Sequence, residues 1–316
     1  MSIYARLITS VFVLLGLICF AAYLRRREFI KEEHGGIFAK LVTHATLPAL
    51  IFTSLARTTI VWSEAWLALI MVVAELFALS LGWVGARLLR LDRPSTGALI
   101  LVSGFGSSSL LGYALISQVF PGNTAAMTEA VVVSEIGVGP LLFTLGTMIA
   151  IYYGNEDAGR DARLKAALEF FRSPIFISVA AGLIWAWFKL PTEGPVMGAI
   201  IQALDLAGAA NTMMVTLLVG LLLHFKGIWA VALPGLAVAA NKLILKPLII
   251  WLPTLAMSVP SWEVQILILE AAMPSALLTV ALSRTYGCNA GLASRMVFLT
   301  TALGAVTIPI MFELLG

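Results

Sequence analysis

The sequence has little charge and few of the residues that usually carry out chemistry. Only 12% of its 316 residues are Asp, Glu, Lys or Arg, about half the share of an ordinary soluble domain. Its two cysteines, Cys19 and Cys288, lie in separate segments, which predicts neither a disulfide framework nor a metal site. The CxxC, HExxH, GxxxxGK[ST] and DDxxD patterns are absent. We therefore expect no metal, no cofactor, no ATP-driven step, no enzyme activity and no nucleic-acid partner.

Apolar residues fill the chain instead. Hydrophobic residues make up 60% of it, and the mean hydropathy is +0.98. Windows of about 20 apolar residues predict membrane-spanning helices. The first window is followed by Arg25, Arg26 and Arg27, the reverse of a cleavable signal peptide, so we expect it to be retained. We predict an all-α integral membrane protein with ten spans, at 5–24, 36–56, 64–87, 97–119, 127–152, 173–189, 196–223, 228–254, 263–283 and 291–314.

Basic residues predict how these helices are oriented, because cytoplasmic loops carry an excess of Lys and Arg. One set of loops holds nearly all of them, and the opposite set holds little beyond Arg57 and Lys189. Both termini should therefore face the non-cytoplasmic side of a bacterial inner membrane. The residues of the basic set are Arg25, Arg26, Arg27, Lys31, Arg87, Arg90, Arg93, Arg160, Arg163, Lys165, Arg172, Lys226, Arg284 and Arg295.

The longest loop, at 153–172, divides the chain into two halves, 1–152 and 173–316, with five predicted helices each. We expect this loop to be a cytoplasmic linker. Because five is an odd number, the two halves must have opposite orientations in the membrane. That relation predicts an inverted repeat, a common architecture among secondary transporters.

The fourth predicted helix contains the segment SGFGSSSLLG, at 103–112, with three glycines and four serines. Such a segment is a weak helix, and lipid offers no water to loosened backbone groups. The matching helix of the second half contains Pro274, which also breaks a helix. Paired breaks of this kind indicate a transporter binding site, although small residues also serve helix packing. The substrate-binding residues expected here are Gly106, Ser107, Ser108, Ser109, Gly112, Pro274 and Ser275.

Ionisable residues within the predicted spans are a second group of candidates, since charge in a membrane is costly and often functional. Glu75 in the third helix and Lys242 in the eighth predict a buried ion pair between corresponding helices. The pair could be structural, or Lys242 could replace a coupling cation, or Glu75 could bind a proton. Glu135 and Glu270 are further coupling candidates. We expect Lys246, one turn beyond Lys242, to extend toward the membrane surface.

Three polar residues of the second and seventh helices are expected to line the binding site from the opposite side. His44 could titrate near neutral pH, and Asn211 and Thr212 offer hydrogen bonds. Asp205 is a weaker candidate. We expect Glu129, near the outer end of the fifth helix, to be solvated.

Several segments resemble the auxin efflux carrier family, whose bacterial members include malonate and malate permeases and whose plant members export auxin. The longest is AAMPSALLTVALSRTYGCNAGLASRMVFLTTALGAVTIPIM, at 271–311. Shorter ones are LPALIF at 47–52, LLFTLGTMIA at 141–150 and NKLILKPLI at 241–249. The resemblance implies the ten-helix inverted-repeat fold shared with bile acid/sodium symporters. In it, helices 1, 2, 6 and 7 form a scaffold, and helices 3–5 and 8–10 form a mobile core that contains the crossing broken helices.

The chain also departs from that family. Ser107 stands where helix 4 of the family has Asn, and Ala114 stands where it has Pro after the glycine matched by Gly112. Leu278 stands where helix 9 often has Asn. Two carboxamides are therefore missing, which favours a more apolar or bulkier anion.

These observations predict a secondary transporter of a small organic anion, a carboxylate, that works by an elevator-type movement and is coupled to protons. The near alternative is a sodium-coupled symporter of the bile-acid type. A channel or sensor is less favoured, because no selectivity filter or appended domain is evident. The resemblance also implies a homodimer formed through the scaffold.

Overall fold

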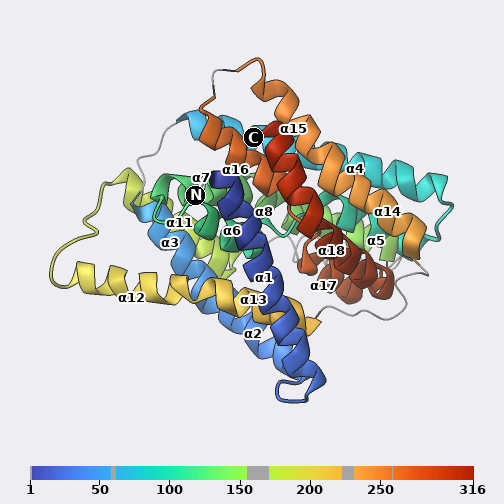
Figure 1. Ribbon diagram of the computed structural model, residues 1–316, viewed down its shortest axis with the longest axis horizontal. Helices are drawn as coiled ribbons and strands as arrows, with labels where there is room; N and C mark the ends of the chain where they lie inside the picture. Colours follow the sequence, from blue (N-terminus) through green and yellow to red (C-terminus); the bar gives the residue numbers. More distant parts are fainter. Residues whose placement is uncertain (1, 58–61, 155–170, 223–230, 258) are drawn as a thin grey trace.

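The structure is a computed structural model and describes residues 2–57, 62–154, 171–222, 231–257 and 259–316 (Figure 1). Residues 155–170 of the predicted linker lie outside the described residues, and so do Arg160, Arg163, Lys165 and Lys226 of the basic set. In the described part of the chain, regular structure is entirely helical, and the one pairing between extended segments is an isolated bridge.

The helices of the first half, with their bounds, are α1 (Ile3–Arg26), α2 (Gly35–Leu41), α3 (Leu47–Ala56), α4 (Trp62–Leu88), α5 (Arg93–Gly104), α6 (Tyr113–Val119), α7 (Thr124–Val131), α8 (Gly139–Leu141) and α9 (Thr147–Gly154). Those of the second half are α11 (Pro174–Trp187), α12 (Met197–Ala209), α13 (Asn211–Leu222), α14 (Ala232–Ala240), α15 (Lys246–Thr254), α16 (Ser261–Ala272), α17 (Leu277–Tyr286) and α18 (Ala290–Leu315). Short π-helical stretches join several of them.

Seven helical segments in the described residues are long and apolar enough to cross a membrane, which supports an integral membrane protein. Ten spans were predicted. The sixth, fourth and ninth predicted spans are not among the seven. The sixth corresponds to α11, which has only 14 residues. The fourth is interrupted between α5 and α6, and the ninth between α16 and α17. The seven are Ile3–Arg26, Gly35–Ala56, Trp66–Leu88, Thr124–Gly154, Met197–Leu222, Ala232–Thr254 and Ala290–Leu315.

Prolines explain where the long helices widen into π-helix. A proline has no N–H, and its ring clashes with the carbonyl four residues earlier, so the preceding turn must open. Three π-helical stretches end two residues before a proline: Val42–Thr46 before Pro48, Val132–Val138 before Pro140 and Asn241–Leu245 before Pro247. The stretches Ser108–Gly112 and Leu142–Gly146 have Ala114 and Met148 at that offset, so they widen without a proline.

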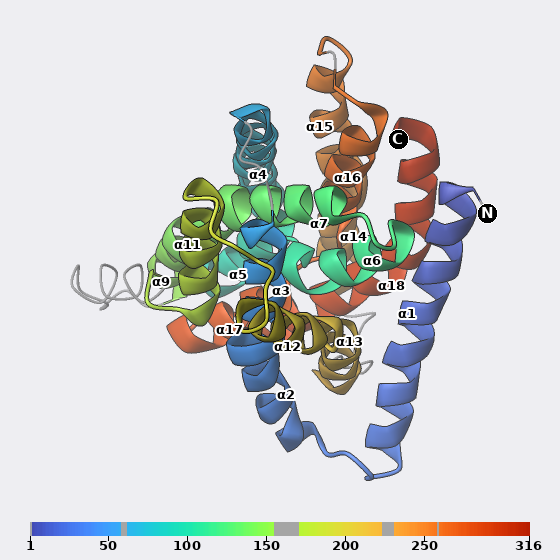
Figure 2. The ribbon, with the colours of Figure 1, turned by 90° about the vertical axis from the view of Figure 1, so that its left-hand side faces the viewer.

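The helices pack as two groups. In the α3 group (α1, α2, α3, α11, α12 and α13), α3 packs on α11 and α12, and α1 packs on α13. In the α5 group (α4–α9 and α14–α18), α4 packs on α5, and α18 packs on α5, α14, α16 and α17. Figure 1 shows α12 and α13 beside α2 and α3 on one side, and α4, α14 and α15 on the other. α1 also contacts α6 and α18, and α7 contacts α3, so a long boundary runs between the groups. Figure 2 shows α1 running down one side of the molecule beside α6 and α18.

Candidate functional site

The two interrupted helices meet at their breaks. α5 ends at Gly104, and the chain then runs extended through Phe105 to Ser107. α16 ends at Ala272, and the chain is extended from Met273 to Ala276 before α17 begins. The two extended segments lie antiparallel, with Gly106 opposite Ser275. We call residues 105–107 and 273–276 together the crossover.

Pairing between the segments supplies hydrogen-bond partners to backbone groups that would have none in lipid. The Ser107 N–H donates to the Pro274 carbonyl at 2.7 Å, and the Ala276 N–H donates to the Phe105 carbonyl at 3.0 Å. The Ser275 N–H donates to Thr300 Oγ1 at 3.2 Å, and the Ser275 hydroxyl donates to the Val102 carbonyl at 2.8 Å. Each break thus supplies hydrogen-bond partners to the other, as a low-dielectric setting requires. The Ser275 side chain serves this contact.

Lys242 is fully buried and binds the end of the first half-helix. Its Nζ donates to the Gly104 carbonyl at 2.7 Å, which places a cation at a helix C-terminus, where the helix dipole favours it. The approach depends on a glycine, because a Cβ at Gly106 would lie 2.8 Å from Lys242 Nζ. The ammonium charge therefore lies directly behind the crossover backbone.

The prediction that Glu75 forms an ion pair with Lys242 is wrong. Glu75 pairs with Lys246, and both side chains are almost completely buried. The prediction that Lys246 extends to the membrane surface is wrong for the same reason. Lys242 and Lys246 lie one turn apart where a π-helical stretch meets α15, so both reach the same buried region.

Glu270 is a buried carboxylate just before the second break. It is 1% exposed, and neither of its carboxylate oxygens accepts a hydrogen bond from the described residues. It faces Gly112, where a Cβ would lie 2.7 Å from Glu270 Oε1. Gly112 thus lets a carboxylate reach the far side of the first interrupted helix.

A cavity of about 220 Å³ lies between the crossover and the α3 group. One wall is formed by the breaks and by the middle of the 124–154 helix, the other by apolar residues of α2, α3, α11 and α13 with Thr43. Within the described part of the chain, no Lys or Arg lines it, and its charged lining residue is Glu135. The predicted site residues that line it are Gly106, Ser107, Ser108, Ser109 and Glu135.

Glu135 is held by two hydroxyl groups. Its Oε1 accepts hydrogen bonds from Ser109 Oγ at 2.5 Å and from the Tyr113 hydroxyl at 2.9 Å. Ser109 Oγ also lies 3.1 Å from Ser134 Oγ. The carboxylate therefore ties the first interrupted helix to the helix beside it, directly at the cavity surface.

The residues predicted to line the site from the second and seventh helices lie elsewhere. His44 is exposed, with Nδ1 2.8 Å from Thr43 Oγ1, and its neighbour Thr43 lines the cavity instead. Asn211 is buried and accepts a hydrogen bond from Thr46 at 2.9 Å. The carbonyl of Thr212 accepts a bond from Thr216. Asn211 therefore joins two helices of the α3 group and does not contact the cavity.

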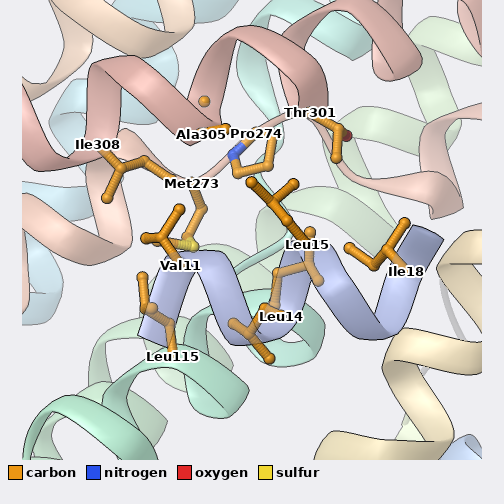
Figure 3. A pocket seen from close by; sticks show the side chains of 12 residues that line it. Val11, Leu14, Leu15, Ile18, Leu115, Met273, Pro274, Thr301, Ala305 and Ile308 are labelled. Carbon is orange, nitrogen blue, oxygen red and sulfur yellow. The ribbon is translucent and has the colours of Figure 1, made fainter. Parts of the chain in front are cut away.

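Pro274 lines a second, smaller crevice on the other side of the crossover. Its volume is about 40 Å³, and Figure 3 shows it between α1 and the residues around Met273 and Pro274, with Leu14 and Ile308 among the side chains that close it. The side chains there are almost all apolar, so this crevice serves packing of α1 against the crossover.

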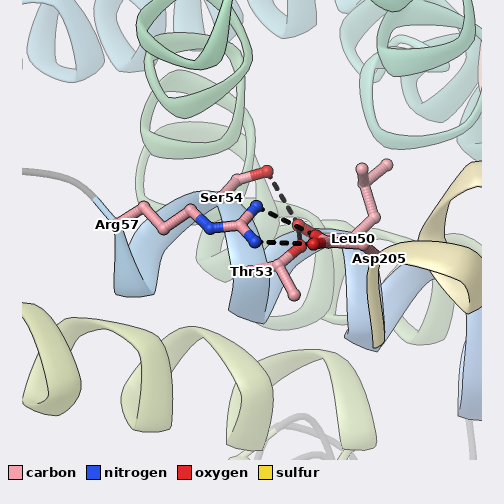
Figure 4. Close-up of polar contacts among 5 residues, drawn as sticks. All are labelled: Leu50, Thr53, Ser54, Arg57 and Asp205. Carbon is pink, nitrogen blue, oxygen red and sulfur yellow. Dashed lines mark hydrogen bonds and ion pairs between the residues drawn. The ribbon is translucent and has the colours of Figure 1, made fainter. Parts of the chain in front are cut away.

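A third hollow, of about 190 Å³, lies at the other end of the boundary between the two groups. Arg57 donates to both carboxylate oxygens of Asp205, at 3.0 and 2.6 Å (Figure 4). Nearby, Thr128 of α7 donates to the Ser54 carbonyl of α3 at 3.0 Å. Glu129 is 2% exposed, so the prediction that it is solvated is wrong: α7 packs between α3 and α16.

Sequence reasoning missed three residues of this region, Thr43, Tyr113 and Ser134, and gave Lys246 the wrong position. Tyr113 and Ser134 flank Ser109 and Glu135, and a polar residue beside a buried carboxylate is a signal that could have found them. Leu278, which stands where the family that the sequence resembles often has Asn, lines the cavity. The missing carboxamide is thus replaced by an apolar contact surface.

Comparison with known proteins places the chain among membrane transport proteins. The profile of a family described as "Membrane transport protein" matches residues 6–312. An uncharacterized transporter of Methanothermobacter thermautotrophicus is 25% identical over 302 residues, which cover 95% of this chain and 94% of the relative. An uncharacterized transporter of Methanocaldococcus jannaschii is 24% identical over 283 residues, 88% of this chain and 89% of the relative. The Escherichia coli uncharacterized transporter YfdV is 24% identical over 259 residues, 79% of each chain.

Proposed function

Because the chain belongs to the auxin efflux carrier family of membrane transport proteins, we propose that it is a secondary transporter of a small organic anion that carries a carboxylate. The observation that carries this proposal is the cavity of about 220 Å³ at the crossover. Serine hydroxyl groups and the ends of interrupted helices line one wall, and such groups bind carboxylates. Apolar residues form the other wall, which suits a substrate with an apolar body.

The charges around the cavity suit an anion, because the positive charge that attracts it lies behind the cavity wall. Lys242 lies behind Gly106, so its field reaches the crossover without an ammonium group inside the cavity. A bound carboxylate would then accept hydrogen bonds from Ser107 and Ser108. Leu278 and the opposite wall leave few polar partners for a second carboxylate. A monocarboxylate with a bulky apolar group is therefore the form of anion that we favour.

We propose that the fold is the inverted repeat of two five-helix halves, with the α3 group as scaffold and the α5 group as mobile core. The interrupted helices stand fourth in each half, which supports this arrangement. The cavity and the hollow at Arg57 lie along one boundary, with Leu47 lining the first and Leu50, one turn on, lining the second. A sliding movement of the core would carry the crossover from one hollow to the other and would break the contact between Thr128 and Ser54.

The cavity residues of α2, α11 and α13 are close in sequence to basic residues that we predict to be cytoplasmic. We therefore propose that the conformation described here is an inward-facing state. Movement to the outward-facing state would bring Ser107 and Ser108 toward the hollow that contains Arg57.

Proton coupling is the form of energy supply that we propose. Among the described residues, contacts with the two breaks and with one another group five buried ionisable side chains: three carboxylates, Glu75, Glu135 and Glu270, and two ammonium groups, Lys242 and Lys246. If all are charged, three negative and two positive charges leave one net negative charge, which a single proton would neutralise. Glu135 is the carboxylate that lines the cavity, so it is the residue that we expect to exchange this proton. A sodium ion would need several oxygen ligands, and Lys242 occupies the helix end where one would bind.

A thermal-shift screen of purified protein tests the proposal, because a ligand stabilises the folded state by mass action. Malonate, malate, benzoate and indoleacetate are compared with and without sodium at two pH values. We expect a rise in Tm with one of the aromatic acids, independent of sodium. The Ser108→Val variant should lose the shift, and Ser80→Val should keep it, since Ser80 is exposed on α4 and bonds only its own helix. No shift with any carboxylate, or a shift retained by Ser108→Val, would refute the assignment of the site.

Proteoliposome uptake of the acid identified in that screen tests the coupling. Wild-type uptake should rise with an imposed proton gradient and should not respond to sodium. Glu135→Gln should abolish the response to the gradient, and Glu135→Asp should restore part of it. Uptake that follows sodium and ignores the proton gradient would favour the symporter of the bile-acid type.

A further inference from the structure

A basic hollow lies at the turn between α4 and α5, at the opposite end of α5 from the crossover. It has a volume of about 440 Å³. Arg87, Arg90 and Arg93 line it, together with the aromatic residues Trp83, Tyr152 and Tyr153. Within the described residues, no Asp or Glu lines it. The guanidinium groups of Arg87 and Arg90 make this hollow a site for an anion.

The local backbone brings these arginines together. α4 ends at Leu88, and the Leu91 N–H bonds back to the Ala86 carbonyl, which closes the helix end. Arg90 has φ of 51°, in the left-handed region, where a residue with a side chain is strained and glycine or asparagine is easier to place. Arg90 thus places a long cationic side chain at a backbone position where glycine would be the least strained residue.

Two of the guanidinium groups are held by aromatic rings. The guanidinium of Arg87 lies 4.3 Å from the centre of the Trp83 ring, and that of Arg93 lies 5.0 Å from the centre of the Tyr152 ring. Arg93 also donates to the Tyr152 carbonyl at 2.5 and 3.2 Å. Stacking on Trp83 fixes the plane of the Arg87 guanidinium, so that the N–H groups at its edge can bind a phosphate in a fork.

The surface beside the hollow is apolar. Val84 is 42% exposed, Leu88 is 78% exposed and Trp83 is 40% exposed, all on the last two turns of α4. Trp and Tyr gather at the level of lipid headgroups, with Arg and Lys beside them. A basic pocket between membrane helices at that level suits an anionic headgroup, and the exposed side of α4 offers a surface for the acyl chains. A freely soluble phosphate would use only the arginines.

We propose that this hollow binds the phosphate group of an anionic phospholipid, with the guanidinium groups of Arg87 and Arg90 on the phosphate oxygens and the acyl chains along α4. The lipid then contacts the first residues of α5, the half-helix that ends at the crossover. It stabilises the α5 group, and it does so whatever substrate the cavity takes.

Native mass spectrometry of the full chain in detergent tests this, with phosphatidylglycerol and phosphatidylcholine added in turn. We expect phosphatidylglycerol adducts at lower lipid concentration than phosphatidylcholine adducts. Arg87→Gln combined with Arg90→Asn should weaken phosphatidylglycerol binding by about tenfold or more, since each basic side chain contributes to attraction of anionic lipid. Arg284→Gln, which removes one exposed charge elsewhere, should bind as the wild type does. Equal binding by the double variant, or no preference over phosphatidylcholine, would overturn the proposal.

Two further measurements separate lipid binding from a folding defect and from binding of free phosphate. Arg90→Asn alone places a residue that tolerates the left-handed backbone, so it should fold at least as well as the wild type and still bind phosphatidylglycerol more weakly. Inorganic phosphate and glycerol phosphate, at millimolar concentration and without lipid, should not raise Tm. If they do so in the wild type and not in the double variant, the site takes free phosphate and the lipid assignment fails.

Discussion

In the described part of the chain, one ion pair joins helices within each of the two groups, and the surroundings of the two pairs differ. Glu75 and Lys246 in the α5 group are 0% and 1% exposed, whereas Arg57 and Asp205 in the α3 group are 38% and 39% exposed. A buried pair pays a large desolvation cost and needs close partners; a half-exposed pair costs little and contributes little. The α5 group therefore keeps its charges at an energetic cost beside the crossover, and the α3 group keeps its pair near water.

The two walls of the cavity repeat this contrast. Polar groups and Glu135 lie on the α5 side, and the α3 side presents mainly Leu, Ile and Ala with a single threonine. An apolar wall makes few hydrogen bonds that a moving partner would have to break. We expect the α5 group to carry both substrate recognition and coupling, and the α3 group to serve as the surface along which it moves.

The largest expected effect is on the buried pair. Glu75→Gln or Lys246→Met leaves one charge buried without its partner, so each should lower the free energy of unfolding by about 3–5 kcal/mol. The decrease would be measured as a lower Tm of the purified protein in detergent.

The matched control is the double variant Glu75→Gln with Lys246→Met. It removes both charges and should recover most of the loss, because no unpaired charge remains. Two single variants as stable as the wild type would mean that water reaches the pair, and the contrast between the groups would then be wrong.

A smaller effect is expected at Gly106. In Gly106→Ala the new Cβ would lie 2.8 Å from Lys242 Nζ and 3.0 Å from Cε, so the ammonium must move away from the Gly104 carbonyl. Loss of this charged hydrogen bond should cost about 1.5–3 kcal/mol and should reduce transport of the identified substrate. Tm and proteoliposome uptake would measure the two effects.

Gly16→Ala is the control for that substitution, since no atom lies within 4 Å of a Cβ there. It should leave Tm equal or slightly higher, because alanine favours helix. In a Lys242→Met background, Gly106→Ala should cost less than in the wild type. An undiminished cost would place the strain on the backbone of the crossover and not on Lys242.

Much of the fold could be predicted from the sequence because lipid imposes strict rules. Long apolar windows predicted the membrane helices, and the glycine and serine run at 103–112 and Pro274 predicted the breaks at which α5 and α16 end. These rules act on local composition. The contact between the two breaks, 168 residues apart from Ser107 to Ser275, was inferred from symmetry and needed the structure for its hydrogen bonds.

The site was less predictable because side-chain direction depends on π-helical turns. The stretch Val42–Thr46 widens before Pro48, and Thr43 reaches the cavity while His44 points outward. The stretch Asn241–Leu245 widens before Pro247, and Glu75 meets Lys246 in place of Lys242. A pattern of 3.6 residues per turn does not show these shifts. Glu129 illustrates a second limit, since its burial comes from packing of α7 on helices distant in sequence.

The smallest expected effect is at the half-exposed pair. Arg57→Ala or Asp205→Ala should lower the free energy of unfolding by little, and a double-mutant cycle should give a coupling of about 0.2–1 kcal/mol. Raising the salt concentration should reduce this coupling further, because ions screen exposed charges, and the same salt should leave the buried pair unchanged. The cycle would be measured from Tm values at low and high salt. A coupling above about 2 kcal/mol that resists salt would mean that the hollow around Arg57 excludes water, and the α3 group would then hold a buried charge pair of the same kind as the α5 group.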